Sequence, residues 1–155
     1  MQKINLVKAI VRYIPSFWVR DFVQGNPNRN NSGRYLLLKK AKDKFFPENI
    51  EKWELVGGVI KPGETSRKTI ERELEEETGL KIGLNARIVK QLPTLNSEKS
   101  VCDIYFIETS SMKIKRSDEH SDYIWKKAAE VKDMDLVLYA DLFLEFFNNP
   151  EKYFN

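Results

Sequence analysis

Three glutamates in the segment 66–78 have the spacing of a shared helix face. At about 100° per residue, Glu73, Glu76 and Glu77 fall on one side, because residues three and four apart are neighbours on a helix. Like charges at such spacings destabilise an isolated helix by a few tenths of a kcal/mol each. A bound divalent cation removes that repulsion, and carboxylate and carbonyl oxygens suit Mg²⁺ and Mn²⁺. A solvated acidic helix is the alternative interpretation.

Glycines stand at both ends of this predicted helix. Gly57 and Gly58 precede it and would let the backbone approach the same cation closely. Thr65 or Ser66 can cap its first turn, and Gly79 stands where a left-handed C-terminal cap belongs. The segment therefore predicts a loop and a helix that bring backbone and carboxylate oxygens together.

The flanking residues complete a longer pattern. Gly58, Glu64 and the run RELEEETGL at 72–80 fit G-x5-E-x7-R-E-U-x-E-E-x-G-U without departure, where U is a bulky aliphatic residue. The pattern resembles the box of the Nudix (MutT-like) hydrolase family. The resemblance is tight over 58–80 and looser over 53–131. It implies an α/β fold, an α/β/α sandwich with a mixed β-sheet. The implied activity is a metal-dependent pyrophosphohydrolase that cleaves a nucleoside diphosphate linked to another moiety.

The resemblance also implies a role for each matching position. Glu76 and Glu77 would be the principal ligands of Mg²⁺ or Mn²⁺, and the carbonyl of Gly57 another. Glu73 would be either a ligand or the base that activates water. Arg72 would orient the carboxylates through hydrogen bonds, and Glu64 would support the loop or reach the metal.

Some members of the family take an extra glutamate, as ligand or base, from a loop before a strand that carries tryptophan. Glu119, six residues before Trp125, fits that layout, and Asp122 is a second candidate. Loop charges without a role are the alternative for both. One departure is Val56, where the family commonly has proline, and it weakens the analogy with any particular subfamily.

Substrate identity is not fixed by these residues. A (d)NTP or an ADP-ribose-like compound fits the predicted chemistry. The alternatives are a catalytically silent nucleotide-binding regulator and an RNA 5′-end pyrophosphohydrolase. Arg34 or Arg87 could hold phosphates, but no pattern selects either, and the substrate-binding residues stay unknown. His120, the only histidine, is expected to be exposed. Core packing or loop anchoring is the preferred explanation for the aromatic residues Phe17, Trp18, Phe45, Phe46 and Tyr105.

Composition limits the class of protein. The 155 residues, 41% hydrophobic and 32% charged, predict a single domain over 1–155. No apolar run approaches the roughly 20 residues of a membrane span, and we see no signal peptide. One cysteine, Cys102, and no export signal predict a cytoplasmic protein. The net charge of +3 suits a nucleotide-type small molecule and does not favour nucleic acid. Monomer and homodimer both stay open.

The elements that must position the glutamates follow from hydrophobic periodicity. A loop rich in turn formers at 25–33 separates two segments of a predicted hairpin, and a short apolar segment precedes the glutamate helix. The last predicted helix has Leu136, Tyr139, Ala140 and Phe143 at helical spacing, which favours core packing. Strands are expected at 6–14, 17–24, 35–39, 86–91, 101–108 and 123–126, and helices at 66–78 and 135–148.

Overall fold

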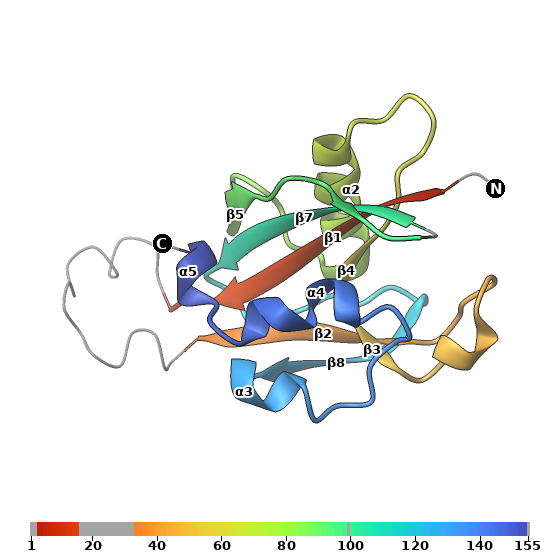
Figure 1. Cartoon of the computed structure of the whole chain (residues 1–155). Coiled ribbons are helices and arrows are strands. Elements are labelled where there is room, and N and C mark those ends of the chain that lie inside the picture. The colour runs from red at the N-terminus through yellow and green to blue at the C-terminus, as the bar shows by residue number, and fades with distance from the viewer. Residues whose placement is uncertain (1–2, 16–32, 99, 155) are drawn as a thin grey trace.

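The computed structural model describes residues 3–15, 33–98 and 100–154. Within them an eight-stranded mixed sheet forms the centre of the molecule (Figure 1). Its strands are β1 (Ile4–Tyr13), β2 (Arg34–Lys40), β3 (Trp53–Glu54), β4 (Val56–Val59), β5 (Ala86–Gln91), β6 (Leu95–Asn96), β7 (Ser100–Thr109) and β8 (His120–Lys126). The helices are α2 (Ser66–Thr78), α3 (Ala128–Val131), α4 (Asp141–Leu144) and α5 (Glu151–Phe154), with 3₁₀ turns η1 (Pro47–Asn49) and η2 (Glu145–Phe147).

Strand β1 pairs with three other strands of the sheet, one along one edge and two along the other. It runs parallel to β7 over its whole length. On the other edge its first half pairs antiparallel with β4, with Val7 opposite Gly58 and Lys8 opposite Gly57. Its last two residues, Arg12 and Tyr13, pair with β2 instead. This register lays the paired glycines directly beside the first half of β1.

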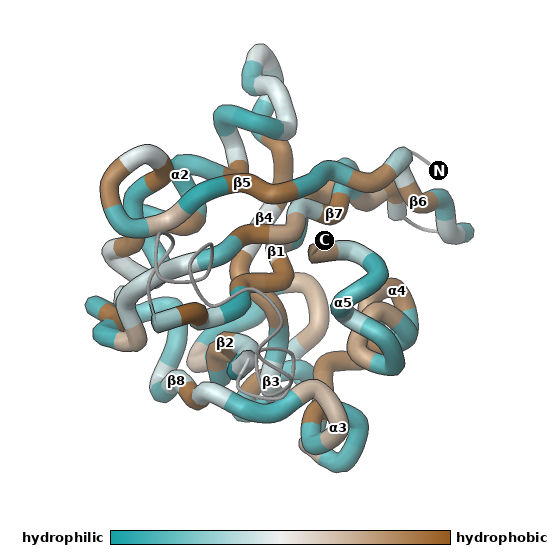
Figure 2. Tube along the Cα trace, turned by 90° about the vertical axis from the view of Figure 1, so that its left-hand side faces the viewer, coloured by the Kyte–Doolittle hydropathy of each residue, from teal (hydrophilic) through white to brown (hydrophobic). Residues whose placement is uncertain are grey.

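Both faces of the sheet are buried, so its central strands are apolar on both sides. Along β1, Val7, Ala9 and Val11 belong to one core cluster and Ile10 to the other. Ile70 and Leu74 of α2 cover the first face, whereas the C-terminal helices cover the second with Phe143, Phe146, Phe147 and Phe154. Figure 2 shows α2 and α4 on opposite sides of β1. The expected sandwich of helices around a mixed sheet is therefore confirmed.

The glutamate helix has the predicted bounds. The Thr65 hydroxyl accepts a hydrogen bond from the backbone N–H of Lys68, which satisfies one of the free donors of the first turn. Gly79 ends the helix in the left-handed conformation, with φ of 76°, and its N–H bonds to the carbonyl of Glu75. Ile70 and Leu74 are fully buried, as the apolar stripe predicted.

The predicted continuous helix at 135–148 is wrong. The N–H of Trp53 bonds to the carbonyl of Asp135, and the N–H of Val137 bonds to the carbonyl of Trp53. These bonds hold 135–137 extended beside β3, so helical structure begins only at Asp141. The predicted core character is confirmed for Ala140 and Phe143, which are buried, whereas Leu136 and Tyr139 are partly buried against the same cluster.

The remaining sequence expectations have mixed outcomes. The strands expected at 35–39, 86–91, 101–108 and 123–126 are present as β2, β5, β7 and β8. The strand expected at 17–24 lies outside the described residues, as do Phe17 and Trp18. Cys102 is buried in β7. In the three described stretches, no helix has the length and apolar character needed to span a membrane.

Candidate functional site

Helix α2 and the loop before β8 bring three carboxylates together. One oxygen each from Glu73, Glu77 and Glu119 lie within 4.8 Å of one another. Glu77 is buried, Glu73 is partly buried, and Glu119 is exposed. The sequence predicted that Glu73 and Glu77 share a helix face and that Glu119 reaches the same place from a distant loop. The three side chains do converge.

Glu77 is held by the backbone of Gly57, the first glycine of the pair. Its Oε1 accepts a hydrogen bond of 2.9 Å from the backbone N–H of Gly57. A Cβ on Gly57 would lie 2.0 Å from the carbonyl oxygen of Val7, and its φ of +145° also excludes other residues. Burial, reinforced by the nearby Glu54, raises the pKa of Glu77 well above that of an ordinary glutamate.

Glu73 lies against the second glycine. A Cβ on Gly58 would stand 2.8 Å from Oε1 of Glu73, so only a residue without a side chain leaves room for this carboxylate. Burial raises the pKa of Glu73, and the neighbouring Arg72 opposes that effect. In β4, Gly57 therefore lies against the Glu77 carboxylate and Gly58 against the Glu73 carboxylate.

Arg72 donates hydrogen bonds to three glutamates of the motif. Its Nε and Nη2 each donate to one oxygen of Glu64 at 2.9 Å, and its Nη1 donates to Glu73 at 3.0 Å and Glu76 at 3.2 Å. The paired bonds from Arg72 lower the pKa of Glu64 to about 2. The Glu76 side chain is 57% exposed and lies outside the group of three converging carboxylates. Asp122 is exposed, and its Oδ1 accepts the N–H of Tyr123.

A buried polar cluster that was not predicted lies beside Glu77, and we call it the Glu54 cluster: Lys8, Glu54, His120 and Tyr139. Glu54 accepts hydrogen bonds from Lys8 at 2.9 Å, His120 Nε2 at 2.8 Å and the Tyr139 hydroxyl at 2.6 Å. His120 is 2% exposed, so the expectation of an exposed loop histidine is wrong. It begins β8, and its pairing with Lys40 of β2 draws it inside.

Charge balance inside the cluster follows from these contacts. Burial alone would raise the pKa of Glu54, but Lys8, His120 and Lys40 outweigh it and hold that pKa well below the ordinary value. Burial likewise opposes the charge of Lys8, yet Glu54 leaves its pKa raised. The signal in the sequence was a charged residue inside an apolar run: Lys8 between Val7 and Ala9, and Glu54 between Trp53 and Leu55.

The carboxylates lie in the wall of a cleft of about 910 Å³. Lysines line part of it, and Phe45 and Phe46, which are 63% and 38% exposed, line another part. Their exposure rules out core packing for these two phenylalanines, and loop anchoring stays a prediction. Tyr105 is buried as expected. The lining of the cleft includes Lys40, Lys42, Lys44, Phe45, Phe46, Glu73, Glu77, Glu98 and Glu119.

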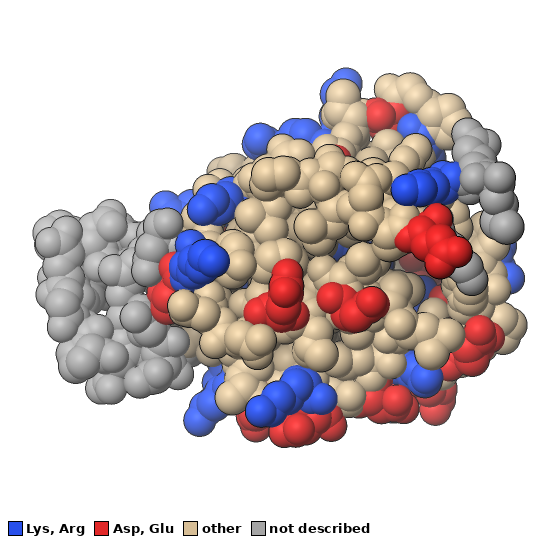
Figure 3. Space-filling model, in the orientation of Figure 1, with Lys and Arg blue, Asp and Glu red and all other residues tan. Residues whose placement is uncertain are grey.

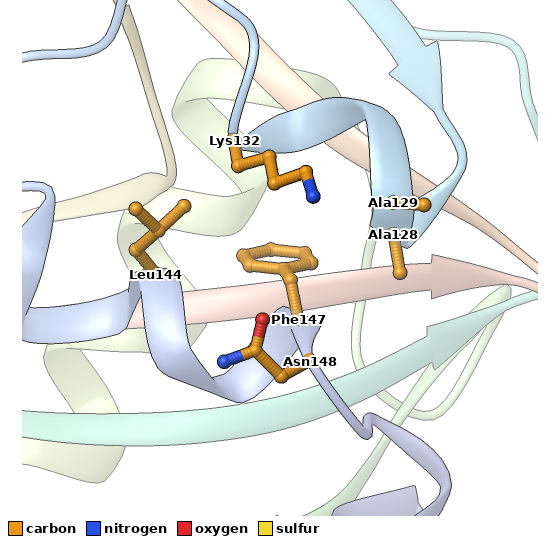
Figure 4. Close-up of a pocket in the computed structure, with 6 residues that line it drawn as sticks. All are labelled: Ala128, Ala129, Lys132, Leu144, Phe147 and Asn148. Atoms are coloured by element: carbon orange, nitrogen blue, oxygen red, sulfur yellow. The ribbon is translucent and has the colours of Figure 1, made fainter.

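Neither arginine considered for phosphate binding lines this cleft. Arg87 donates to Glu108 at 2.9 Å, and Arg34 lies 3.9 Å from Glu130. A smaller hollow of about 190 Å³ lies between α3 and η2, where Lys132 extends over the ring of Phe147 (Figure 4). It shares no lining residue with the cleft and has no carboxylate in its lining. The large cleft is therefore the candidate site.

Comparison with known proteins agrees with this geometry. The family model of the NUDIX domain matches residues 23–146. A nucleoside triphosphatase, NudI, of Klebsiella pneumoniae is 34% identical over 123 residues, which are 71% of this chain and 84% of that protein. A putative 8-oxo-dGTP diphosphatase of Bacillus subtilis is 37% identical over 70 residues, 44% of this chain and 43% of that protein.

Structural likeness extends over nearly the whole chain. The crystal structure of a Caenorhabditis elegans Ap4A hydrolase binary complex superposes with a TM-score of 0.68 at 15% identity, covering 96% of both chains. At that identity the likeness concerns the fold alone. The complete glutamate motif, its support by two glycines and the match of the NUDIX model over most of the chain lead to one assignment: the chain belongs to the NUDIX family of hydrolases.

Proposed function

We propose that this enzyme hydrolyses a nucleoside diphosphate linked to another group, with Mg²⁺ or Mn²⁺ held by Glu73, Glu77 and Glu119. The observation that carries the proposal is the convergence of three carboxylate oxygens within 4.8 Å at the cleft. Glu76 and the carbonyl of Gly57 remain predicted ligands from the family resemblance. Glu64 is proposed to act through Arg72, because both of its oxygens accept bonds from that guanidinium.

The donor set fits a hard divalent cation. All three converging groups are carboxylates, the ligands that Mg²⁺ and Mn²⁺ prefer. Two of them belong to one helix, and burial opposes ionisation of both. A bound cation compensates that unfavourable burial. When bound, it would neutralise phosphate oxygens and supply a water of lowered pKa.

The side chains around the cation have separate tasks in this proposal. Either Glu73 or Glu119 accepts the proton of the attacking water. Arg72 fixes the Glu73 carboxylate through the bond from Nη1. The N–H of Gly57 fixes Glu77. These contacts hold the carboxylates in place before substrate arrives, which is the preorganisation that catalysis by positioning requires.

The cleft lining favours a nucleotide. Lys42 and Lys44 supply positive charge for phosphates, and Phe45 and Phe46 offer exposed rings for a base. We favour nucleoside triphosphates, because the relatives named above are a nucleoside triphosphatase and a putative 8-oxo-dGTP diphosphatase. On the face drawn in Figure 3, Lys and Arg are scattered and form no continuous basic field, which gives no support to an RNA substrate.

A substrate panel tests the proposal. Purified protein is assayed with Mg²⁺ or Mn²⁺ on nucleoside triphosphates, 8-oxo-dGTP, ADP-ribose, dinucleoside polyphosphates and capped RNA. Glu119→Gln is compared with Glu98→Gln, which changes another exposed glutamate of the same cleft. We expect metal-dependent release of a nucleoside monophosphate, reduced in Glu119→Gln and unchanged in Glu98→Gln. No turnover of any nucleotide, or equal loss in both variants, contradicts the proposal.

A further inference from the structure

Within the Glu54 cluster, every oxygen of Glu54 has a donor. Lys8 and the Tyr139 hydroxyl both donate to Oε1, and Oε2 faces Nε2 of His120 at 2.8 Å. The Glu54 side chain is 4% exposed, and that of His120 is 3% exposed. Because both groups are removed from water, these bonds determine how the imidazole ring is oriented.

The bond to Glu54 also determines which ring nitrogen carries a hydrogen. An ionised carboxylate only accepts hydrogen bonds, so Nε2 of His120 must be the donor. Nδ1 is then left on the opposite edge of the ring. It is buried and has no hydrogen-bond partner among the described residues.

That unpartnered nitrogen faces Glu77. Nδ1 lies 3.6 Å from Oε2 of Glu77, beyond a hydrogen bond but in direct contact. The other oxygen of Glu77, Oε1, already accepts the N–H of Gly57. The carboxylate is thus enclosed between a backbone donor on one side and the His120 ring on the other.

We propose that His120 is a positioning residue: Glu54 holds its ring in place, and the ring edge, packed against Oε2, limits rotation of the Glu77 carboxylate and so prepares it for divalent-cation binding. The inference rests on the proposed function, because it takes Glu77 as a ligand. Neither His120 nor Glu54 belongs to the group of three converging carboxylates, and the proposal gives neither of them a bond to the cation. They act through Glu77, as the outer partners of metal ligands do when they fix ligand orientation.

Two substitutions at His120 separate its two contacts. The amide of His120→Asn comes near the former Nδ1 and keeps an atom in contact with Glu77. The amide of His120→Gln reaches the former Nε2 and keeps the bond to Glu54 instead. Ser121→Ala is the matched control, because Ser121 is the next residue of β8 and is exposed.

Each protein is titrated with Mn²⁺, and binding is monitored by electron paramagnetic resonance. Thermal unfolding of each metal-free protein measures its stability. We expect the Mn²⁺ Kd of His120→Gln to rise about tenfold, in the range for outer partners of metal ligands. The Mn²⁺ Kd of His120→Asn should rise less, and that of Ser121→Ala should stay the same. In steady-state assays kcat should fall in His120→Gln while the KM for the nucleotide stays the same.

The outcomes separate failure of the positioning role from failure of the proposed function. If both His120 variants lose thermal stability but keep the Mn²⁺ Kd, or if Asn weakens binding as much as Gln, the positioning role is wrong. If the unmodified protein binds no Mn²⁺, the proposed function itself fails. Should neither His120 variant fold, Tyr139→Phe is the substitute, because it removes the hydrogen bond from the Tyr139 hydroxyl to Oε1 of Glu54. A raised Mn²⁺ Kd in Tyr139→Phe supports the positioning role of His120, and an unchanged Kd overturns it.

Discussion

Gly58→Ala is a small change that should separate catalysis from stability. The added Cβ would lie 2.8 Å from Oε1 of Glu73, whereas ordinary van der Waals contact begins near 3.4 Å. The carboxylate must therefore withdraw by roughly 0.6 Å, and misplacement of a catalytic group by 1 Å reduces the rate about 100-fold. We expect kcat to fall by about tenfold or somewhat more.

The same substitution should leave the fold nearly intact. The atoms that the new Cβ meets belong to the end of the Glu73 side chain, which can move. Gly57→Ala is the contrasting variant, because its Cβ would lie 2.0 Å from the backbone oxygen of Val7 and its φ is +145°. We expect Gly57→Ala to lose stability by a large margin and Gly58→Ala by less than about 1 kcal/mol.

Urea unfolding of both metal-free variants and steady-state hydrolysis of the best nucleoside triphosphate measure these effects. The reasoning is refuted if Gly58→Ala keeps full kcat, because Glu73 would then not need its observed position. It is also refuted if Gly58→Ala unfolds as easily as Gly57→Ala, because the loss of activity would then reflect the fold.

Three further substitutions test other parts of the account. Arg72→Lys keeps the charge but loses the paired bonds to Glu64, so kcat should fall about tenfold with little change in melting temperature. Leu74→Ala removes a fully buried side chain of α2 and should destabilise the protein by about 2–5 kcal/mol in urea unfolding. Glu54→Leu leaves Lys8 buried without its main partner, so the free energy of unfolding should fall by about 3–5 kcal/mol at neutral pH. Because the pKa of Glu54 is lowered by folding, its contribution is complete above the ordinary value of 4.5 and is lost in acid, so the difference from unmodified protein should narrow below that pH.

Each of these predictions has a clear contrary result. Full activity in Arg72→Lys would mean that the guanidinium geometry is unimportant. A loss below about 1 kcal/mol in Leu74→Ala would contradict its role in the core. A stability difference for Glu54→Leu that widens in acid would reverse the assigned direction of the Glu54 pKa.

Local signals made α2 predictable to the residue. Its cap at Thr65, its apolar pair and its terminal Gly79 all act within a few residues of chain. The final helix was mispredicted because its periodicity is real but its first residues bond to Trp53, more than 80 positions away. Periodicity cannot reveal a competing backbone partner that distant in the sequence.

In the candidate site, too, local patterns could be predicted and contacts between distant segments could not. Glu73 and Glu77 could be predicted because a helix fixes their relation, and Glu119 because a recognisable pattern surrounds it. The Glu54 cluster could not, since Lys8, Glu54, His120 and Tyr139 come from four segments far apart in the sequence, which only the folded chain brings together. A buried lysine or glutamate inside an apolar strand indicates that a partner exists, but the sequence does not say which residue it is.

The central claim is that Glu77 and its neighbours hold a catalytic divalent cation. Its most direct test is Glu77→Gln, measured by Mn²⁺ binding and by nucleoside triphosphate hydrolysis on the same preparation. Because burial disfavours the Glu77 charge, the metal-free variant should melt at least as high as the unmodified protein. We predict that Mn²⁺ binding and turnover are both lost in that well-folded variant. A Glu77→Gln protein that keeps full metal-dependent turnover would contradict the account.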